Sequence, residues 1–176
     1  MTQNKLKHKN IFLVGFMGAG KSTVGKILAD KIGYSYLDAD QYIEEKAGTK
    51  ITKIFADHGE PYFRDLESEA TEALAKNENQ VIATGGGVVQ RDRNWDAMKE
   101  NGITIYLKAS VETIWERIKD DTSRPLLQVD NPVETARALL NKRTLMYEKA
   151  DAIISTDNLS LEQVADEALN LLNNQN

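Results

Sequence analysis

Short apolar runs alternate with longer stretches of helical periodicity along the chain, which predicts parallel strands joined by helices. Parallel strands need crossover connections, and helices usually supply them. The runs expected to form strands are residues 10–14, 34–37, 81–83, 103–107 and 152–155. A chain of 176 residues is long enough for one domain with a core, so we expect a single α/β domain over residues 1–176 with a five-stranded parallel sheet.

Two segments depart from this alternation of strand and helix. From residue 41 to about residue 77 the pattern remains helical, with breaks at Gly48 and at residues 59–61, and it contains no strand. We interpret this segment as a helical insert over the sheet. Residues 120–131 lack periodicity and lie between two helices, which predicts a mobile loop.

Capping residues mark the start of two helices. Asn131, Pro132 and Glu134 are expected to supply an N-cap, a first helical residue and an acidic third residue. Ser160 and Gln163 have the spacing of a capping box, in which each side chain bonds the other residue's backbone N–H. Helices are therefore expected to begin directly after Asn131 and after Ser160.

Composition and charge exclude several classes of function. The chain has no cysteine, so it contains no disulfide, no thiolate nucleophile and no zinc–cysteine site. The formal net charge of −5 argues against a general nucleic-acid surface, and no apolar run approaches the roughly 20 residues that span a bilayer. We expect a cytoplasmic protein that binds neither nucleic acid nor membrane. Nothing in the pattern demands a partner chain, so a monomer is expected.

Residues 15–22, Gly-Phe-Met-Gly-Ala-Gly-Lys-Ser, fit the phosphate-loop pattern GxxxxGKS. They lie between an expected strand and an expected helix, which is the order found around phosphate loops. This order makes the alternative, a flexible glycine-rich turn that ends in Lys-Ser by chance, unfavourable. Glycines let the backbone N–H groups surround a phosphate, and the N-terminal end of the helix dipole favours its negative charge. Lys21 would reach the outer phosphates of a nucleoside triphosphate, and Ser22 would ligate magnesium.

Acidic residues and glycines follow two other strands. Asp38 and Asp40 come after the second expected strand, and a spacing of two places both on one side of an extended segment. One carboxylate would order magnesium and its waters and the other would engage a substrate hydroxyl. The alternative is that one of them, considered for Asp40 in particular, only caps the helix beginning near Gln41. Residues 84–87, Thr-Gly-Gly-Gly, predict either close backbone approach to a polar ligand or a plain tight turn.

Four arginines are candidates for binding an anion or a base. Arg143 lies in the centre of an apolar helical stripe, where a charge needs a carboxylate or a ligand as partner. Arg64 precedes Glu67 by one turn, which is consistent with a structural ion pair or with bidentate binding of a ligand carboxylate. Arg124 would neutralise a transferred phosphoryl group when its loop closes, and its alternative is an ordinary solvated loop arginine. Arg117 would stack on a base, and its alternative is a surface arginine paired with Glu116 or Asp121.

Taken together, six motifs in this order resemble the shikimate kinase family, and they cover nearly the whole chain. The motifs are the phosphate loop, Asp38-x-Asp40, Phe63-Arg64-x-x-Glu67, Gly85-Gly86-Gly87, Arg124-Pro125-Leu126-Leu127 and Arg143-x-x-x-Tyr147. The resemblance implies a three-layer P-loop NTPase fold whose core begins with residues 10–40. It also implies that residues 41–72 form the substrate-binding insert and that residues 120–131 form a mobile lid.

The resemblance further implies that the chain transfers the γ-phosphoryl group of ATP to the 3-hydroxyl of shikimate, in the route to chorismate and the aromatic amino acids. The catalytic residues would be Lys21, Asp40 and Arg124. The ATP-binding residues would be Gly18, Ala19, Gly20, Lys21, Ser22, Thr23, Arg117, Arg124 and Asp157. The shikimate-binding residues would be Asp40, Arg64, Gly86, Gly87 and Arg143. The implied cofactor is Mg²⁺, bound by Ser22 directly and by Asp38 through water.

Three alternatives are weighed against this interpretation. A kinase of another small hydroxy acid such as gluconate shares the phosphate loop, but Arg64, Arg143 and the triple glycine favour the cyclic acid. A GTP-dependent switch predicts an Asn-Lys-x-Asp signature, whereas residues 141–144 read Asn-Lys-Arg-Thr. A non-catalytic module would be expected to have lost Lys21, Asp38, Asp40 or Arg124, and all four are present. Whether Asp40 acts as a base or only orients a hydroxyl stays open, because a loose phosphoryl-transfer transition state asks little of a base.

Overall fold

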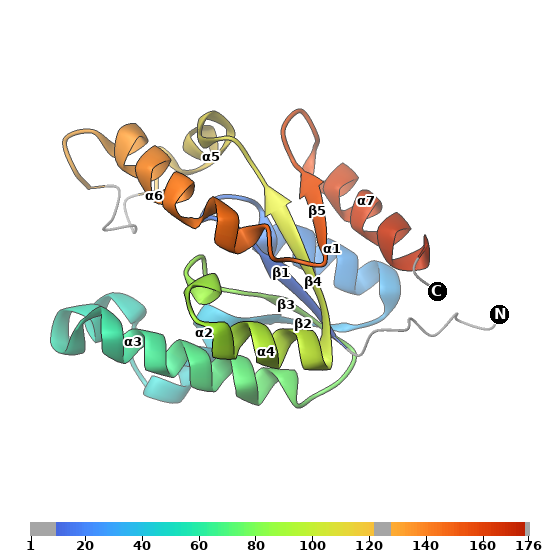
Figure 1. Ribbon diagram of the computed structural model, residues 1–176, viewed down its shortest axis with the longest axis horizontal. Helices are drawn as coiled ribbons and strands as arrows, with labels where there is room; N and C mark the ends of the chain where they lie inside the picture. Colours follow the sequence, from blue (N-terminus) through green and yellow to red (C-terminus); the bar gives the residue numbers. More distant parts are fainter. Residues whose placement is uncertain (1–9, 122–127, 175–176) are drawn as a thin grey trace.

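The computed structural model describes residues 10–121 and 128–174 (Figure 1). Its strands are β1 Asn10–Val14, β2 Ser35–Asp38, β3 Gln80–Ala83, β4 Gly102–Lys108 and β5 Ala152–Ser155. They form one sheet in the order β2-β3-β1-β4-β5, and every neighbouring pair is parallel. The register aligns Leu13 of β1 with Ala83 on one side and with Ile105 on the other. The predicted five-stranded parallel sheet is confirmed.

Helices cover both faces of the sheet (Figure 1). Their bounds are α1 Lys21–Ile32, α2 Ala39–Ala47, α3 Ile51–Ala75, α4 Asp92–Asn101, α5 Val111–Ile118, α6 Pro132–Tyr147 and α7 Leu161–Asn174, with a short 3₁₀ helix η1 at Val88–Gln90. Alternate residues of β1 point to opposite faces, so Ile11 and Leu13 pack with α1 and α7 while Phe12 and Val14 pack with α4 and α6. The expected three-layer arrangement is therefore present.

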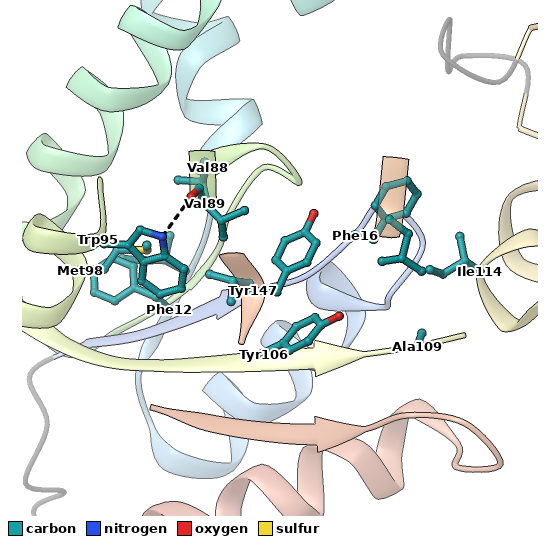
Figure 2. Close-up of a cluster of buried hydrophobic side chains, with 14 of the residues drawn as sticks. Phe12, Phe16, Val88, Val89, Trp95, Met98, Tyr106, Ala109, Ile114 and Tyr147 are labelled. Atoms are coloured by element: carbon teal, nitrogen blue, oxygen red, sulfur yellow. Dashed lines mark hydrogen bonds between the residues drawn. The ribbon is translucent and has the colours of Figure 1, made fainter. Parts of the chain in front are cut away.

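Buried polar contacts hold irregular segments against the second apolar face. The indole Nε1 of Trp95 on α4 donates a hydrogen bond of 3.0 Å to the carbonyl of Val89 in η1 (Figure 2). Beside it, the amide of Asn94 donates to the carbonyl of Val88 at 2.8 Å. These bonds tie the segment that follows the triple glycine to α4, because a buried carbonyl without a partner would cost free energy.

The helical insert consists of α2 and α3 and contains no strand, as its pattern predicts. The expected break at residues 59–61 is present within α3, where Gly59 adopts φ 80° and ψ 175° before Pro61. This conformation is one that glycine adopts readily and other residues avoid. It separates the first part of α3 from the part that carries Arg64 and Glu67.

The two predicted helix starts differ in outcome. The capping box is confirmed, since Gln163 N donates to Ser160 Oγ at 3.1 Å and Ser160 N donates to Gln163 Oε1 at 2.8 Å. The expected cap at Asn131 is wrong in its chemistry: α6 begins after Asn131, but that side chain makes no capping hydrogen bond. Glu134 instead accepts from Arg137 Nε at 3.4 Å.

Part of the expected lid lies outside the described residues, which exclude residues 122–127 and therefore Arg124. Within the described ranges, none of the helices combines the length and apolarity needed to cross a membrane.

Candidate active site

The phosphate loop connects β1 to α1 and requires glycine at defined positions. Gly18 and Gly20 have φ values of 76° and 96°, a region that side chains disfavour. Gly20 also occupies the N-cap position of α1 without any side-chain cap, so the loop leads directly into the helix N-terminus. Backbone N–H groups and a helix N-terminus together form an anion-binding site.

Lys21, the first residue of α1, is only 9% exposed and lies at the end of this loop. Its Nζ donates hydrogen bonds to the carbonyl oxygens of Gly15 at 2.6 Å and of Phe16 at 2.9 Å. The ammonium charge opposes the rise in the pKa of Asp40 that burial causes, so the two groups are electrostatic neighbours. Lys21 thus places a positive charge between the loop and the carboxylates that follow β2.

Asp38 connects the phosphate loop with the insert. Its Oδ2 accepts a hydrogen bond of 3.3 Å from Ser22 Oγ, and its Oδ1 accepts from Gln41 N at 3.0 Å and caps α2. One of the two carboxylates does cap the helix, as the alternative interpretation held, but that residue is Asp38 and not Asp40. Ser22 and Asp38 provide two hard oxygen donors, a set that fits Mg²⁺ because this ion takes few protein ligands and completes its shell with phosphates and water.

Asp40 approaches Asp38 for a different reason from the one that the spacing suggested. Asp38 ends β2 whereas Asp40 lies in the first turn of α2, so the two do not share an extended segment. Burial raises the pKa of Asp40, and the charge of Asp38 raises it further, while Lys21 and Arg64 oppose these effects. Asp40 is thus a carboxylate with an increased affinity for a proton, at the boundary between the phosphate loop and the insert.

Arg64 and Glu67 on α3 form the ion pair that their spacing predicts. Arg64 Nη1 lies 2.8 Å from Glu67 Oε1, and its Nη2 lies 3.0 Å from Glu60 Oε1. The Glu67 side chain is 3% exposed, and burial raises its pKa although Arg64 opposes the shift. Its second oxygen, Oε2, is buried and has no hydrogen-bond partner among the described residues.

The triple glycine after β3 packs directly against these charged side chains. A Cβ at Gly85 would lie 2.8 Å from Glu67 Oε2 and 2.9 Å from Asp40 Oδ1. A Cβ at Gly87 would overlap the guanidinium of Arg64. Glycine is therefore required here for packing against charged side chains of the protein, and the expected backbone contact with a polar ligand stays a prediction.

Arg143 on α6 is buried as its helical phase predicts, with 6% exposure. The expected carboxylate partner is missing: among the described carboxylates, none forms an ion pair with Arg143. Its charge acts on the hydroxyl of Tyr147 one turn later, where it opposes the rise in the pKa of Tyr147. Its Nη1 lies 3.8 Å from where a Cβ at Gly86 would be. A buried guanidinium without an anion is unfavourable, and it makes this position suited to a ligand carboxylate.

Arg117 and Asp157 lie beside the phosphate loop and β5. Arg117 Nη1 donates to the carbonyl of Gly18 at 3.1 Å, so it does not pair with its neighbour Glu116, which binds Lys119 at 2.7 Å. The carboxylate of Asp157 accepts from Ser110 N at 3.0 Å. Burial alone would raise the pKa of Asp157, but its hydrogen bonds outweigh that effect and lower it.

Sequence patterns assigned no function to Tyr147, although it ends a recognised motif. Its hydroxyl donates to the carbonyl of Gly86 at 2.5 Å. Spacing along α6 predicts that Tyr147 and Arg143 are neighbours, but the contact with Gly86 joins segments 61 residues apart and has no local signal.

A sequence model described as shikimate kinase matches residues 17–173 of this chain. The chain belongs to the shikimate kinase family. Within that family it is 48% identical over 161 residues to shikimate kinase of Thermodesulfovibrio yellowstonii, covering 92% of this chain and 93% of the relative. It is 47% identical to that of Persephonella marina, covering 92% and 97% of the two chains. As a member of this family the chain is an ATP-dependent kinase.

Solved structures agree with the family. Shikimate kinase from Acinetobacter baumannii in complex with shikimate superposes with a TM-score of 0.92 at 39% identity, covering 97% of this chain and 96% of that chain. A gluconokinase from Sinorhizobium meliloti superposes with a TM-score of 0.59 at 19% identity, covering 95% and 93%, which shows a shared fold alone. The P-loop kinase fold implied by the resemblance is thus confirmed.

Proposed function

We propose that this chain transfers the γ-phosphoryl group of ATP to the 3-hydroxyl of shikimate, giving shikimate 3-phosphate and ADP. The observation that carries the proposal is the buried guanidinium of Arg143, which has no carboxylate partner among the described residues and lies beside Gly86. This arrangement suits a small acid bound next to a phosphate loop. The A. baumannii relative of similar fold binds shikimate, which supports the same acceptor.

The donor half of the site is built by the phosphate loop and α1. Backbone N–H groups of residues 18–23 and the helix dipole would hold the phosphates of ATP, while Lys21 neutralises charge on the transferred group. Ser22 and the water-bridging Asp38 would hold Mg²⁺, and the ion when bound draws negative charge from the phosphate oxygens. The side-chain bond between Ser22 and Asp38 supports this assignment because it brings two oxygen donors together at the loop.

The acceptor half is built by the insert, the triple glycine and α6. Arg143 and Arg64 would bind the shikimate carboxylate, and the backbone at residues 86–87 would meet its ring hydroxyls. Asp40 would accept a hydrogen bond from the attacking hydroxyl and orient it toward the phosphates. The raised pKa of Asp40 favours receipt of a proton, although phosphoryl transfer needs little help from a base.

The remaining assignments complete the nucleotide site. Arg117 and Asp157 would contact the adenine, and their positions beside the phosphate loop and after β5 support this role. Arg124 would approach the transferred phosphoryl group from a lid at residues 120–131 that excludes water. Arg124→Ala is expected to lower turnover while shikimate affinity stays within a few-fold; a steady-state assay with unchanged turnover would reject this role.

A coupled assay of ADP release with magnesium-ATP tests the proposal, with shikimate and gluconate as rival acceptors. We expect turnover on shikimate and none above background on gluconate. Turnover on gluconate but not on shikimate would overturn the assignment. The proposal includes a cytoplasmic monomer in the route to chorismate; light scattering of the purified chain checks the monomeric state.

A further inference from the structure

Tyr147 is the last residue of α6 and is fully buried beside the acceptor half of the site. Its ring stacks on the ring of Tyr106 from β4, with centroids 5.0 Å apart and planes inclined by 18° (Figure 2). Burial raises the pKa of Tyr147 to about 12, so its hydroxyl remains protonated near neutral pH and can donate. The stacked ring therefore holds a hydrogen-bonding hydroxyl at one position.

That hydroxyl joins two segments that the proposed function places around the acceptor. It donates to the carbonyl of Gly86 at 2.5 Å. The guanidinium of Arg143, one turn earlier on α6, lies beside the same residue, with its Nη1 3.8 Å from where a Cβ at Gly86 would be, and its charge opposes the rise in the pKa of Tyr147. The phenol oxygen keeps lone pairs after this donation, so it can also accept from a neighbouring guanidinium N–H. Tyr147 thus connects the guanidinium on α6 to the backbone that follows β3.

The bond to Gly86 also sets the direction of the next backbone donor. The described peptide bonds include no cis bond, so the Gly86 carbonyl and the Gly87 N–H point in opposite directions from their shared peptide plane. Fixing the carbonyl on Tyr147 therefore turns the Gly87 N–H away from α6. The same bond holds residue 87 where Arg64 packs against it.

We propose that Tyr147 is a positioning residue for acceptor binding: its hydroxyl orients both Arg143 and the Gly86–Gly87 peptide toward the acceptor acid. This inference rests on the proposed function, since it assigns these two groups to the acceptor. Tyr147 itself does not touch the reacting atoms. Its removal is expected to weaken acceptor binding and to leave the nucleotide site unchanged.

Tyr147→Phe tests the proposal because it keeps the stacked ring and removes only the hydroxyl. The hydrogen bond to Gly86, together with the interaction with the charged Arg143, contributes about one to two powers of ten in an equilibrium constant. We therefore expect the KM for shikimate to rise about ten- to hundredfold, the KM for ATP to stay within about twofold, and kcat at saturating shikimate to stay within a few-fold. Tyr106→Phe is the matched control: it makes the same change on the partner ring, whereas the hydrogen bond to Gly86 comes from Tyr147, so all three constants should stay near wild type.

The wild-type assay separates the two levels of inference. If the wild type does not phosphorylate shikimate, the proposed function fails. If it does and Tyr147→Phe matches Tyr106→Phe, the function stands and the positioning role is overturned. Parallel rises in both KM values with a lowered melting temperature, or failure of Tyr147→Phe to fold, would assign the hydroxyl to the stability of the fold and equally overturn the role.

A double-mutant cycle with Arg143→Gln checks the route of the effect. If Tyr147 acts largely through Arg143, the two substitutions combine to less than the product of their separate effects on the KM for shikimate. If the KM for shikimate of the double variant equals the product of the two separate effects, Tyr147 does not act through the guanidinium of Arg143.

Discussion

Arg64 and Arg143 carry the same charge, but their surroundings differ in a way that mutation can separate. Arg64 is paired with Glu67 and Glu60, whereas Arg143 has no carboxylate partner among the described residues. Removing Arg64 leaves the Glu67 carboxylate buried without its cation, which is costly in a protein interior. Removing Arg143 leaves no carboxylate unpaired.

We therefore predict that Arg64→Ala and Arg143→Ala both raise the KM for shikimate by at least tenfold and leave the KM for ATP near wild type. Only Arg64→Ala should also lower the free energy of unfolding substantially, by about 3 kcal/mol. Steady-state kinetics and urea titrations of both variants check this difference. Equal losses of stability, or an effect confined to ATP, would contradict the distinction.

Asp40 is predicted to show a trade between stability and activity. Its pKa in the folded chain is raised above 3.8 by burial and by Asp38, so its stabilising contribution is present below that value and is lost as pH rises through the raised pKa. Asp40→Asn should therefore have a higher free energy of unfolding than wild type at pH 7, and this difference should disappear as the pH falls below the ordinary aspartate pKa of about 4. Its activity on shikimate should fall.

The control for this prediction is Asp57→Asn. Asp57 is exposed, and the hydrogen bond from Lys53 lowers its pKa, so the sign of its pH dependence is opposite. Denaturant titrations between pH 3 and pH 8 distinguish the two. An Asp40→Asn variant less stable than wild type at neutral pH would show that the attraction of Lys21 outweighs burial.

At the scale of elements, the site depends on the shape of α3. The conformation of Gly59, φ 80° with ψ 175°, breaks the helix and is almost restricted to glycine. Space is not limiting there, since the nearest atom to an added Cβ is Pro61 Cδ at 3.8 Å. The break is therefore maintained by backbone preference and not by crowding.

Gly59→Ala is consequently expected to lower the free energy of unfolding by about 1–3 kcal/mol through backbone strain, and to raise the KM for shikimate as α3 straightens. Gly33→Ala is the control, because Gly33 ends α1 with φ 73° in open space and lies on another element. It should cost about 1 kcal/mol without any change in KM. A Gly59→Ala chain with wild-type stability would reject the strain.

At the scale of the whole molecule, Asn10 joins segments that are far apart in the sequence. It is fully buried, its Nδ2 donates to the carbonyls of Ala75 at 3.3 Å and Asn77 at 2.7 Å, and its Oδ1 accepts from Gln80 N at 3.2 Å. It thereby links the start of β1 to the end of α3 and to β3. The phosphate loop and the triple glycine both emerge from this pair of strands.

Asn10→Ala is predicted to leave several buried polar groups unsatisfied and to reduce the free energy of unfolding by about 3 kcal/mol. The KM values of the folded fraction should not change, because Asn10 lies at the opposite end of β1 from the phosphate loop. Lys53→Ala removes an exposed ion pair and should change stability by less than about 0.5 kcal/mol. Thermal unfolding of the three chains measures this; a stable Asn10→Ala would show that the network is dispensable.

Local patterns were sufficient to predict the strands, the phosphate loop, the break in α3 and the burial of Arg143. Apolar periodicity and glycine preferences depend on residues near one another in the chain, so these features are readable from the sequence alone. The same local reasoning placed Asp38 and Asp40 together, but for the wrong reason. Local reasoning could not predict that Asp38 would cap α2. The spacing of the two carboxylates does not determine whether Ala39 continues the strand or begins a helix, and in the structure it begins α2.

Only the tertiary structure decided which groups meet across the sheet edge. Arg143 finds Tyr147 and not a carboxylate, and the Tyr147 hydroxyl finds Gly86, because α6 packs over β4 beside the loop after β3. Glu67 Oε2 and Asp40 converge on Gly85 for the same reason. Hydrophobic burial sets how the elements pack, and the contacts between distant polar groups follow from that packing without leaving a periodic trace in the sequence.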